Sequence, residues 1–376
     1  MEEIKNEKIK VAIAINDFVV GGAQKLITEL FKKFDSDKFE WHLITLFQFP
    51  EKWEFYDLLP NYVQIHKFNF RGGKDVIEIF KLLKKLRKLK LDIVITNIFL
   101  TSTIFRILKP FTGYKIAVIK HNTEIFRSKW QEWVDRILNL ITDSIIAEAP
   151  TVADFTVKTE GVKREKIKII PGVVNLEKIE NAKKNFNRKE ILRKIGFDEK
   201  NKIIINVARL THQKNHKLLI DGFAEFVKKH PEYKLIIISE GTLKNELLKQ
   251  TSDLKISDKV SFLGLVDNIY KYYLVSDFFA ISSFMEGFCL SAVEAMACGI
   301  PVVSTKTAGP DEYIQNGYNG YLMDGFSVNE MAGILEKMHN SDIKTMGENA
   351  RKTVEKYSVD KVAKMYENLI LEVVNK

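Results

Sequence analysis

The chain has 376 residues, and two domains are the natural expectation for that length. Hydrophobic residues make up 45% of it, an ordinary globular composition that suffices for two sizeable cores. The formal net charge of +9 favours acidic partners, and phosphate groups, anionic lipid and nucleic acid all satisfy it. The spacing of the two cysteines, Cys289 and Cys298, excludes the usual zinc motifs, so a reduced, cytosolic compartment fits best.

The first half of the chain alternates β-rich runs with helical segments. The apolar run at 11–15 is too short for a signal-peptide core and is typical of a strand, from which a Gly21-Gly22 turn leads into a helix near 23–34. The longest apolar region, 93–111, is interrupted by polar residues and predicts strand, loop and helix rather than a membrane span. Further strands are expected at 41–47, 63–67, 93–96, 116–119 and 144–147.

The segment 74–90 predicts a strongly amphipathic helix. One interpretation is a surface helix that packs on the strand at 93–96 and has a solvated lysine face. The other has the lysine face dock on anionic lipid, and both can hold because the apolar face can still pack inward. The expected apolar face carries Val76, Ile79, Phe80, Leu83 and Leu86, and the polar face carries Lys81, Lys84, Lys85 and Lys88.

A polar stretch at 175–202 separates a second alternating series from the first. Several strands of the chain are apolar throughout, as expected for parallel strands covered on both faces. The pattern predicts two doubly wound α/β domains, 1–171 and 172–357, and a C-terminal helix within 358–376 that packs back toward the first domain. The second series has expected strands at 203–208, 234–239, 260–263, 277–281 and 302–304.

Two loops that follow predicted strands carry residues suited to a phosphate. Gly21 and Gly22 would let the backbone approach a ligand closely, although a merely tight turn explains the pair equally well. Arg209 and Lys214 follow the first strand of the second domain, where open parallel sheets bind ligands. A guanidinium fork beside an ammonium suits a diphosphate, and a pair of solvated loop charges is the equal alternative.

The strongest signal lies at 284–303, where a strand delivers the chain to Glu286 and a helix is expected from about 290 to 298. The backbone N–H groups of residues 288–290 begin this helix and are expected to form an anion seat. Glu294 has a local alternative, because Ser291-Ala292-Val293-Glu294 fits a capping box that needs no ligand. Glu286 has no such local explanation.

These stretches resemble the large family of retaining glycosyltransferases with the GT-B fold. Glu286 and Glu294 match the family's two glutamates separated by seven residues, in a string similar to E-G-F-x-L-x-x-x-E-A-M-A-x-G-x-P-V-V. The family's basic loop and N-terminal glycine turn are matched at 208–215 and 21–24. Glycine is usual in the family at the positions of Ala208 and Ser239, and a small residue at that of Cys289; these departures touch fine shape and remove no charged site residue.

The resemblance implies two Rossmann-like domains facing across a cleft, with a nucleotide-diphosphate sugar as donor substrate. It implies that a histidine on a first-domain loop reaches the transferred sugar. His121 follows the strand at 116–119 and is the natural match, with a loop histidine of no role as the alternative. The other implied roles are donor-sugar contact for Glu286, ribose binding for Glu294, and donor-diphosphate binding for Arg209, Lys214 and the amides of Phe288, Cys289 and Leu290.

We therefore expect a retaining, metal-independent hexosyl- or N-acetylhexosaminyltransferase that uses a UDP-sugar and acts in bacterial surface-polysaccharide or glycan biosynthesis. The acceptor would be a hydroxyl of a glycan or lipid-linked molecule. We expect no cofactor and no nucleic-acid partner. We also expect no metal, because the single D-x-D, Asp35-Ser36-Asp37, lies in a polar connection. The expected location is cytoplasmic, peripheral on the inner face of the membrane. The oligomeric state stays open, and the alternatives are a nucleotide-sugar epimerase of the same fold and a non-catalytic glycosyltransferase-like partner.

Overall fold

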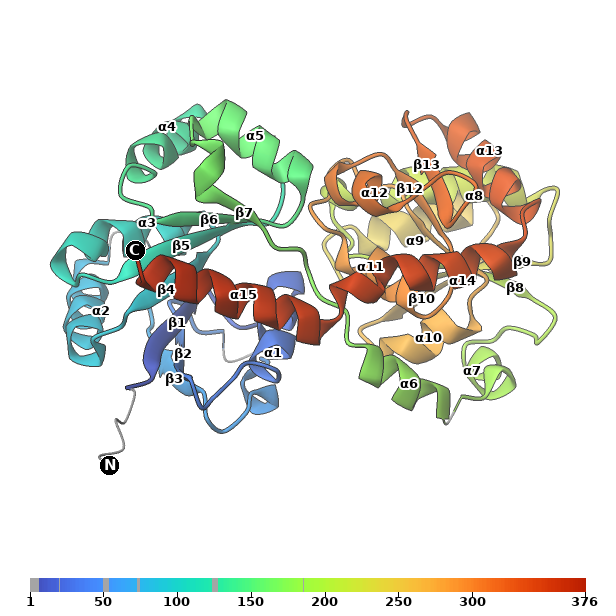
Figure 1. Ribbon diagram of the computed structural model, residues 1–376. Coiled ribbons are helices and arrows are strands. Elements are labelled where there is room, and N and C mark those ends of the chain that lie inside the picture. The colour runs from blue at the N-terminus through green and yellow to red at the C-terminus, as the bar shows by residue number, and fades with distance from the viewer. Residues whose placement is uncertain (1–6, 20, 50–53, 73–74, 124–127, 185) are drawn as a thin grey trace. The chain divides into compact units, whose positions relative to one another are not determined.

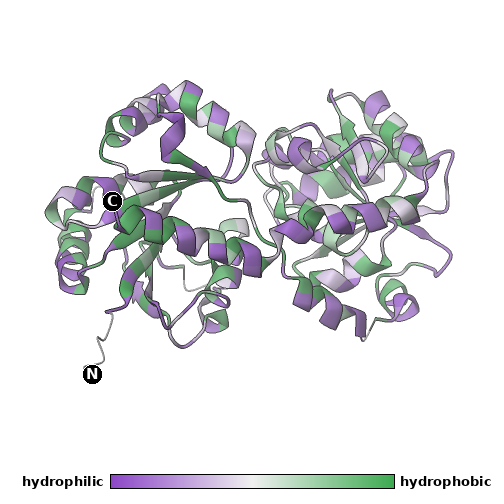
Figure 2. Cartoon of the chain, viewed as in Figure 1, coloured by the Kyte–Doolittle hydropathy of each residue, from purple (hydrophilic) through white to green (hydrophobic). Residues whose placement is uncertain are grey.

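The computed structural model describes the chain except residues 1–6, 20, 50–53, 73–74, 124–127 and 185 (Figure 1). The chain forms two compact units, of which the first comprises Met1–Val173 and Val359–Lys376 and the second Val174–Ser358. Each unit is built around one parallel sheet, and Figure 2 shows the central strands in hydrophobic colours. The extreme N-terminus and residue 74, the predicted start of the amphipathic helix, lie outside the described residues.

The sheet of the first unit has seven parallel strands in the order β3-β2-β1-β4-β5-β6-β7. The strand order reverses between β1 and β4, which is the switch point where doubly wound sheets bind ligands. The central strands β4 and β6 are buried at every residue, as their apolar sequences predict. The strands are β1 (Ile9–Ile15), β2 (Phe39–Thr45), β3 (Gln64–Lys67), β4 (Ile93–Asn97), β5 (Lys115–Lys120), β6 (Ser144–Ala147) and β7 (Ile167–Ile169).

Helices between these strands cover the first sheet. They are α1 (Gly22–Phe31), α2 (Val76–Leu89), α3 (Phe99–Leu108), α4 (Lys129–Leu138) and α5 (Pro150–Glu160), with short 3-10 turns η1 (Tyr56–Leu58), η2 (Lys109–Phe111) and η3 (Arg164–Lys166). The region expected to be strand, loop and helix is β4 followed by α3, which confirms that prediction. Among the described residues, every helix is too short or too polar to cross a bilayer.

The C-terminal helix α15 (Val359–Val374) belongs to the first unit. The Glu367 carboxylate accepts the backbone N–H of Asp35 at 2.7 Å, although the two residues are 332 positions apart. Glu372 pairs with Lys168 of β7 at 2.8 Å. The last helix therefore contacts both the α1–β2 connection and the edge of the first sheet.

The second unit has a six-stranded parallel sheet in the order β10-β9-β8-β11-β12-β13. Its strands are β8 (Lys202–Val207), β9 (Tyr233–Ile238), β10 (Val260–Gly264), β11 (Phe278–Ile281), β12 (Val302–Thr305) and β13 (Gly320–Met323). Its helices are α6 (Leu176–Lys184), α7 (Arg188–Lys194), α8 (His216–Val227), α9 (Lys244–Asp253), α10 (Ile269–Val275), α11 (Leu290–Ala297), α12 (Ala308–Tyr313), α13 (Val328–His339) and α14 (Ile343–Val354), with 3-10 turns η4 (His212–Lys214) and η5 (Glu355–Tyr357).

Helix α2 buries only part of the predicted face. Ile79, Leu83 and Leu86 belong to or pack against the core as expected. Leu82 and Leu86 are buried, whereas Val76 and Phe80, which were expected to pack inward, are 59% and 66% exposed. At about 100° per residue, Phe80 lies roughly 160° around the helix from Leu82, so the two cannot share a buried stripe. Phe80 was predicted to be buried because it follows Val76 by four residues, the spacing of one helix face, but that face is exposed to solvent. The lysine face of α2 therefore carries apolar side chains as well.

Candidate functional site

The carboxyl edge of the second sheet brings together a lysine and a glutamate that lie far apart in the sequence. Lys214 ends the turn η4 after β8, and Glu286 lies in the loop after β11. The lysine Nζ lies 2.7 and 2.8 Å from the two carboxylate oxygens of Glu286. Ser283 donates its hydroxyl to the same carboxylate at 2.6 Å. Glu286 is 6% exposed, so a cation and a hydroxyl compensate a nearly buried carboxylate.

Arg209 lies on the same loop as Lys214 but is in a different environment. Its side chain is exposed, and within the described part of the chain its guanidinium makes no hydrogen bond or ion pair. A guanidinium offers five N–H donors in a planar fork, which matches a phosphate. The arginine is therefore available for an anionic ligand, whereas the lysine pairs with Glu286 and has one of its three N–H donors left for a ligand.

The position of the Arg209 loop is set by its contact with the turn after β9. Leu210 donates its N–H to the carbonyl of Glu240 at 3.1 Å and accepts the N–H of Leu243 at 3.0 Å. A Cβ added at Gly241 would lie 2.4 Å from the Leu210 oxygen, so this close approach requires glycine. Ser239 has φ of 144°, a conformation that residues other than glycine rarely adopt, at a position where the family usually has glycine.

The N-terminus of α11 follows directly from the Glu286 loop. Its N-cap residue, Cys289, has left-handed torsions (φ 58°, ψ 69°), and Leu290 begins the helix. The Phe288 carbonyl accepts the Tyr313 hydroxyl at 3.0 Å. A Cβ at Gly309 would lie 2.1 Å from the Gly287 oxygen, which shows how closely α12 approaches this loop. The loop is thus held from behind by α12, and the helix N-terminus provides the amides predicted to bind an anion.

Cys289 contributes backbone rather than thiol chemistry. Burial raises the pKa of its thiol to about 12, with the negative charge of Glu286 adding to the effect. The thiol therefore stays protonated at neutral pH and is a poor nucleophile. Cys298, at the other end of α11, is also a buried free cysteine.

The capping-box alternative for Glu294 is wrong. The N-cap of α11 is Cys289, so Ser291 lies inside the helix and Glu294 lies in its second turn. The left-handed conformation of Cys289 lets the helix begin before the serine that the motif assigns as its cap. Glu294 is 5% exposed, and its carboxylate accepts the Tyr270 hydroxyl at 3.2 Å. Glu294 thus needs an explanation other than helix capping.

In the first unit, His121 lies at the carboxyl edge of the sheet, directly after β5. Its Nδ1 lies 2.8 Å from Glu148 Oε1, and its Nε2 lies 2.8 Å from Asn97 Oδ1. These partners come from the ends of the neighbouring strands β6 and β4. Both contacts as placed need a proton on each ring nitrogen, whereas turning the Asn97 amide would suit a neutral ring. In either form the imidazole is held between two elements.

The remaining predicted residues of the first unit are Gly21 and Gly22, at the start of α1. Gly21 has extended torsions (φ −169°, ψ 169°), which any residue adopts, so the turn itself does not require glycine there.

The D-x-D pair forms hydrogen bonds within its own loop, because Asp35 accepts the N–H groups of Asp37 and Lys38 at 2.8 and 3.1 Å. These backbone donors, Lys38 first, lower the pKa of Asp35.

Several supporting residues were not predicted from the sequence. Asn97 and Glu148 could have been found, because each follows a strand at the same sheet edge as His121. Ser283 also follows a strand, three residues before Glu286. Tyr270 and Tyr313 reach the site from other helices, 24 and 25 residues from their partners, and nothing local in the sequence marks them.

Two family models match this architecture. "Glycosyltransferase Family 4" matches residues 20–178, and "Glycosyl transferases group 1" matches residues 187–353, so together they account for most of the chain. The chain belongs to the group 1 glycosyltransferases. The two parallel sheets with alternating helices confirm the predicted two-domain GT-B fold.

Three individual proteins illustrate what the chain is similar to. N-acetyl-alpha-D-glucosaminyl L-malate synthase of Bacillus anthracis is 30% identical over 190 residues. The match covers about half of each protein, 49% of this chain and 49% of the synthase. The UDP-Gal:alpha-D-GlcNAc-diphosphoundecaprenol alpha-1,3-galactosyltransferase of Escherichia coli is 24% identical over 388 residues, 97% of this chain and 98% of the relative. Anabaena Alr3699/HepE, solved in complex with UDP-glucose, has a TM-score of 0.85 at 19% identity, covering 97% of this chain and 100% of that one.

Proposed function

We propose that this glycosyltransferase moves a sugar from a nucleotide-diphosphate donor, with retention, to a hydroxyl of a glycan or lipid-linked acceptor. The observation that carries the proposal is the nearly buried Glu286 held by Lys214 beside the start of α11, with the uncommitted Arg209 on the same loop as the lysine. The relative from Escherichia coli is named for a UDP-galactose donor and a diphosphoundecaprenol-linked sugar. Its name and the UDP-glucose bound to HepE support UDP as the donor nucleotide.

The chemistry requires that negative charge be stabilised on the leaving diphosphate while the sugar becomes oxocarbenium-like. Arg209 and the first amides of α11 supply fixed donors for that negative charge. Lys214 pairs with the carboxylate of Glu286, which would face the positive charge that develops on the sugar. Glu294 would bind the ribose hydroxyls, since a carboxylate can accept two hydrogen bonds from vicinal hydroxyls.

For the acceptor step, we propose that the leaving phosphate oxygen takes the proton of the attacking hydroxyl on the same face of the sugar. His121 would contact the transferred sugar, with Glu148 and Asn97 holding its ring. Proton NMR of the first product tests retention, because an inverted anomeric configuration in the initial product would exclude a front-face mechanism.

Incubation with labelled nucleotide sugars separates this proposal from its two alternatives. Transfer to an added lipid-linked acceptor supports the glycosyltransferase. Isomerisation of the nucleotide sugar without an acceptor would indicate an epimerase, and no turnover with any donor would indicate a non-catalytic partner. Arg209→Ala is the matched negative control, because the exposed side chain can be removed with little structural cost.

We also propose that the first unit associates with anionic membranes through the exposed side of α2 and its surroundings. Phe80, Phe111 and Leu140 are 66%, 58% and 80% exposed. Arg87 donates to the Phe111 carbonyl at 3.3 Å, and Lys109 donates to the Ile141 carbonyl at 2.6 Å, which connects α2, η2 and the end of α4. Exposed apolar side chains beside lysines are typical of interfacial binding. A lipid-linked acceptor would be reached from such a surface.

A further inference from the structure

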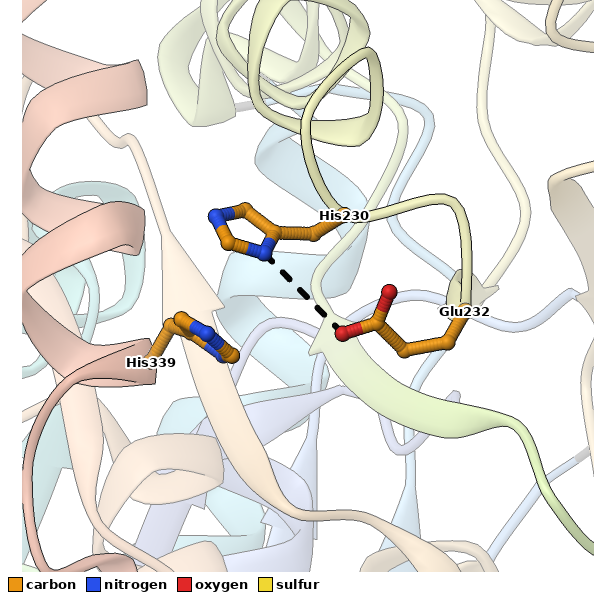
Figure 3. Close-up of side chains that lie close together, drawn as sticks. All are labelled: His230, Glu232 and His339. Atoms are coloured by element: carbon orange, nitrogen blue, oxygen red, sulfur yellow. Dashed lines mark ion pairs between the residues drawn. The ribbon is translucent and has the colours of Figure 1, made fainter.

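A cluster of two histidines and a glutamate lies at the opposite edge of the second sheet from Glu286. His230 and Glu232 belong to the connection between α8 and β9, and His339 is the last residue of α13 (Figure 3). Strand β9 runs from this cluster to the turn that supports Arg209. Its six residues span about 20 Å at roughly 3.3 Å per residue, so the cluster lies far from the donor-binding edge. The proposed sugar-transfer reaction does not use the three side chains of this cluster.

The three side chains converge on one point. One ligand atom from each lies within 4.8 Å of the other two. His230 Nδ1 is 4.0 Å from Glu232 Oε1. The His230 and His339 rings pack on one another with centroids 4.0 Å apart and planes tilted by 44°, so the rings must turn apart to share one ion. Figure 3 shows the side chains pointing toward one another.

The outer nitrogens of both histidines have partners of the kind seen around metal sites. His230 Nε2 lies 2.9 Å from Glu336 Oε2, which leaves Nδ1 for the interior of the cluster. His339 Nδ1 lies 3.1 Å from the hydroxyl of Tyr233, which leaves Nε2. A metal-ligating histidine usually donates its other N–H to a carboxylate or another oxygen, which fixes the ring and its tautomer.

We propose that His230, Glu232 and His339 bind one zinc ion, which joins the α8–β9 connection to the end of α13. Two imidazoles and one carboxylate are a zinc-type ligand set, and water would complete a tetrahedron. Bonds of about 2.0–2.1 Å place ligand atoms roughly 3.4 Å apart, so the cluster must contract by about 1 Å. The Glu232 side chain is 38% exposed and can move by that amount. The proposed site lies away from the donor-binding edge and does not rest on the proposed function.

Calorimetry with zinc chloride on chelator-treated, tag-free protein tests the proposal. We expect one ion per chain and a higher melting temperature in its presence. Cobalt(II) should give the intense visible absorption of a tetrahedral site, whereas magnesium should not bind, because it prefers oxygen ligands. Absence of saturable zinc binding to the wild-type protein would overturn the proposal.

Substitutions locate the ion. His339→Gln and Glu232→Gln should each weaken zinc binding at least tenfold, and Glu336→Gln, which removes the partner of His230, should weaken it by about tenfold. Glu225→Gln is the matched control, because this carboxylate lies on α8 and pairs with Lys228 outside the cluster. The partly exposed Glu232 keeps the test valid if a histidine variant fails to fold. Zinc affinity within about threefold of wild type in both His339→Gln and Glu232→Gln would place the ion elsewhere and refute the site.

Discussion

Glu286 and Glu294 lie on either side of the start of α11 and have different neighbours. Glu286 is bound by Lys214 and Ser283 in a loop, whereas Glu294 projects from the second turn of the helix toward Tyr270. The loop carboxylate lies beside the cations expected to bind the diphosphate. The helix carboxylate accepts the hydroxyl of Tyr270. The two residues should therefore respond differently to removal of their charge.

Glu294→Gln should raise the donor KM and weaken nucleotide-diphosphate binding roughly tenfold to a hundredfold, because a hydrogen bond to a charged acceptor is worth about 1.5–3 kcal/mol. Glu286→Gln should leave that affinity nearly unchanged and lower kcat by about a hundredfold or more, because its interaction grows in the transition state. Calorimetry and initial rates measure both, with thermal melts to confirm folding and Glu240→Gln as an exposed control. Loss of nucleotide binding in Glu286→Gln with normal binding in Glu294→Gln would reverse the assignment.

Ser239 offers a test of backbone strain beside the Arg209 loop. Its φ of 144° is costly for a residue with a Cβ, so Ser239→Gly should raise the free energy of unfolding by about 1 kcal/mol despite the added freedom of the unfolded chain. Ser239→Ala is the control, because alanine keeps the Cβ and should give no gain. Urea denaturation compares the three proteins. Equal stability of the glycine and alanine variants would mean that the strain is relieved in another way.

Charged residues of the candidate site were predictable, and the residues that orient them were mostly not. Arg209, Lys214 and Glu286 follow strands of a parallel sheet, and strand ends can be located from apolar runs. Tyr270 and Tyr313 depend on how α10 and α12 pack, which is decided by tertiary structure and not by any local pattern. The S-x-x-E pattern misled, because the left-handed conformation of Cys289 cannot be seen in the sequence.

At the scale of elements, the eleven predicted strands were all found, most of them because parallel strands in a covered sheet are apolar runs; the exposed edge strand β3 is the exception. The two that were missed, β7 and β13, have three and four residues and lie at sheet edges. For α2, the helix and most of its buried side were predictable, but the exposure of Val76 and Phe80 was not. Apolar residues occur on both of its sides, and the choice of the buried side depends on the neighbouring elements.

A buried ionic network joins α3, β5, α4 and α5 in the first unit. Asp135 contacts both Arg106 and Lys120, and Lys120 also binds Glu160 at 2.6 Å. All four side chains are at most 8% exposed. Lys120 directly precedes His121, so the network also supports the position of that histidine.

Asp135→Asn should lower the free energy of unfolding by about 3–5 kcal/mol, because Lys120 keeps Glu160 whereas the buried guanidinium of Arg106 loses its carboxylate. The control is Asp154→Asn, which removes an exposed carboxylate, 74% accessible, that lies 3.7 Å from Arg164. That change should cost no more than about 1 kcal/mol. Chemical denaturation measures the free energy of unfolding of both variants. Similar decreases for the two aspartates would contradict a stabilising role for the network.

The exposed side of α2 makes a prediction about membranes. Replacing Lys84 and Lys88 with glutamine should weaken binding to anionic vesicles about tenfold or more, since each lysine near such a surface contributes about 1 kcal/mol. Binding should also fall with added salt. Lys249→Gln with Lys255→Gln, on the second unit, is the control pair. Co-sedimentation measures the effect, and equal binding of the wild type to neutral and anionic vesicles would contradict the proposal.

At the scale of the whole molecule, the two edges of the second sheet have different chemistry. The carboxyl edge carries Arg209, Lys214 and the amides of α11, all of which suit an anion. The amino edge carries the His230 cluster, which suits a cation. Because β9 separates them by about 20 Å, an ion at the amino edge cannot reach the bond that breaks during sugar transfer. A requirement for metal in folding and a requirement for metal in catalysis can therefore be separated by experiment.

We predict that sugar transfer survives metal chelation while thermal stability falls. The guanidinium of Arg209, the ammonium of Lys214 and the helix amides can stabilise the leaving diphosphate without a divalent ion. Donor turnover should therefore change by less than about tenfold, which corresponds to roughly 1.4 kcal/mol of barrier, when a chelator is added at a temperature well below the melting transition. The same chelator should lower the melting temperature of the wild type but not that of His339→Gln, which lacks the proposed zinc site. A larger loss of turnover in folded protein, restored by magnesium or manganese, would show that catalysis itself needs a metal.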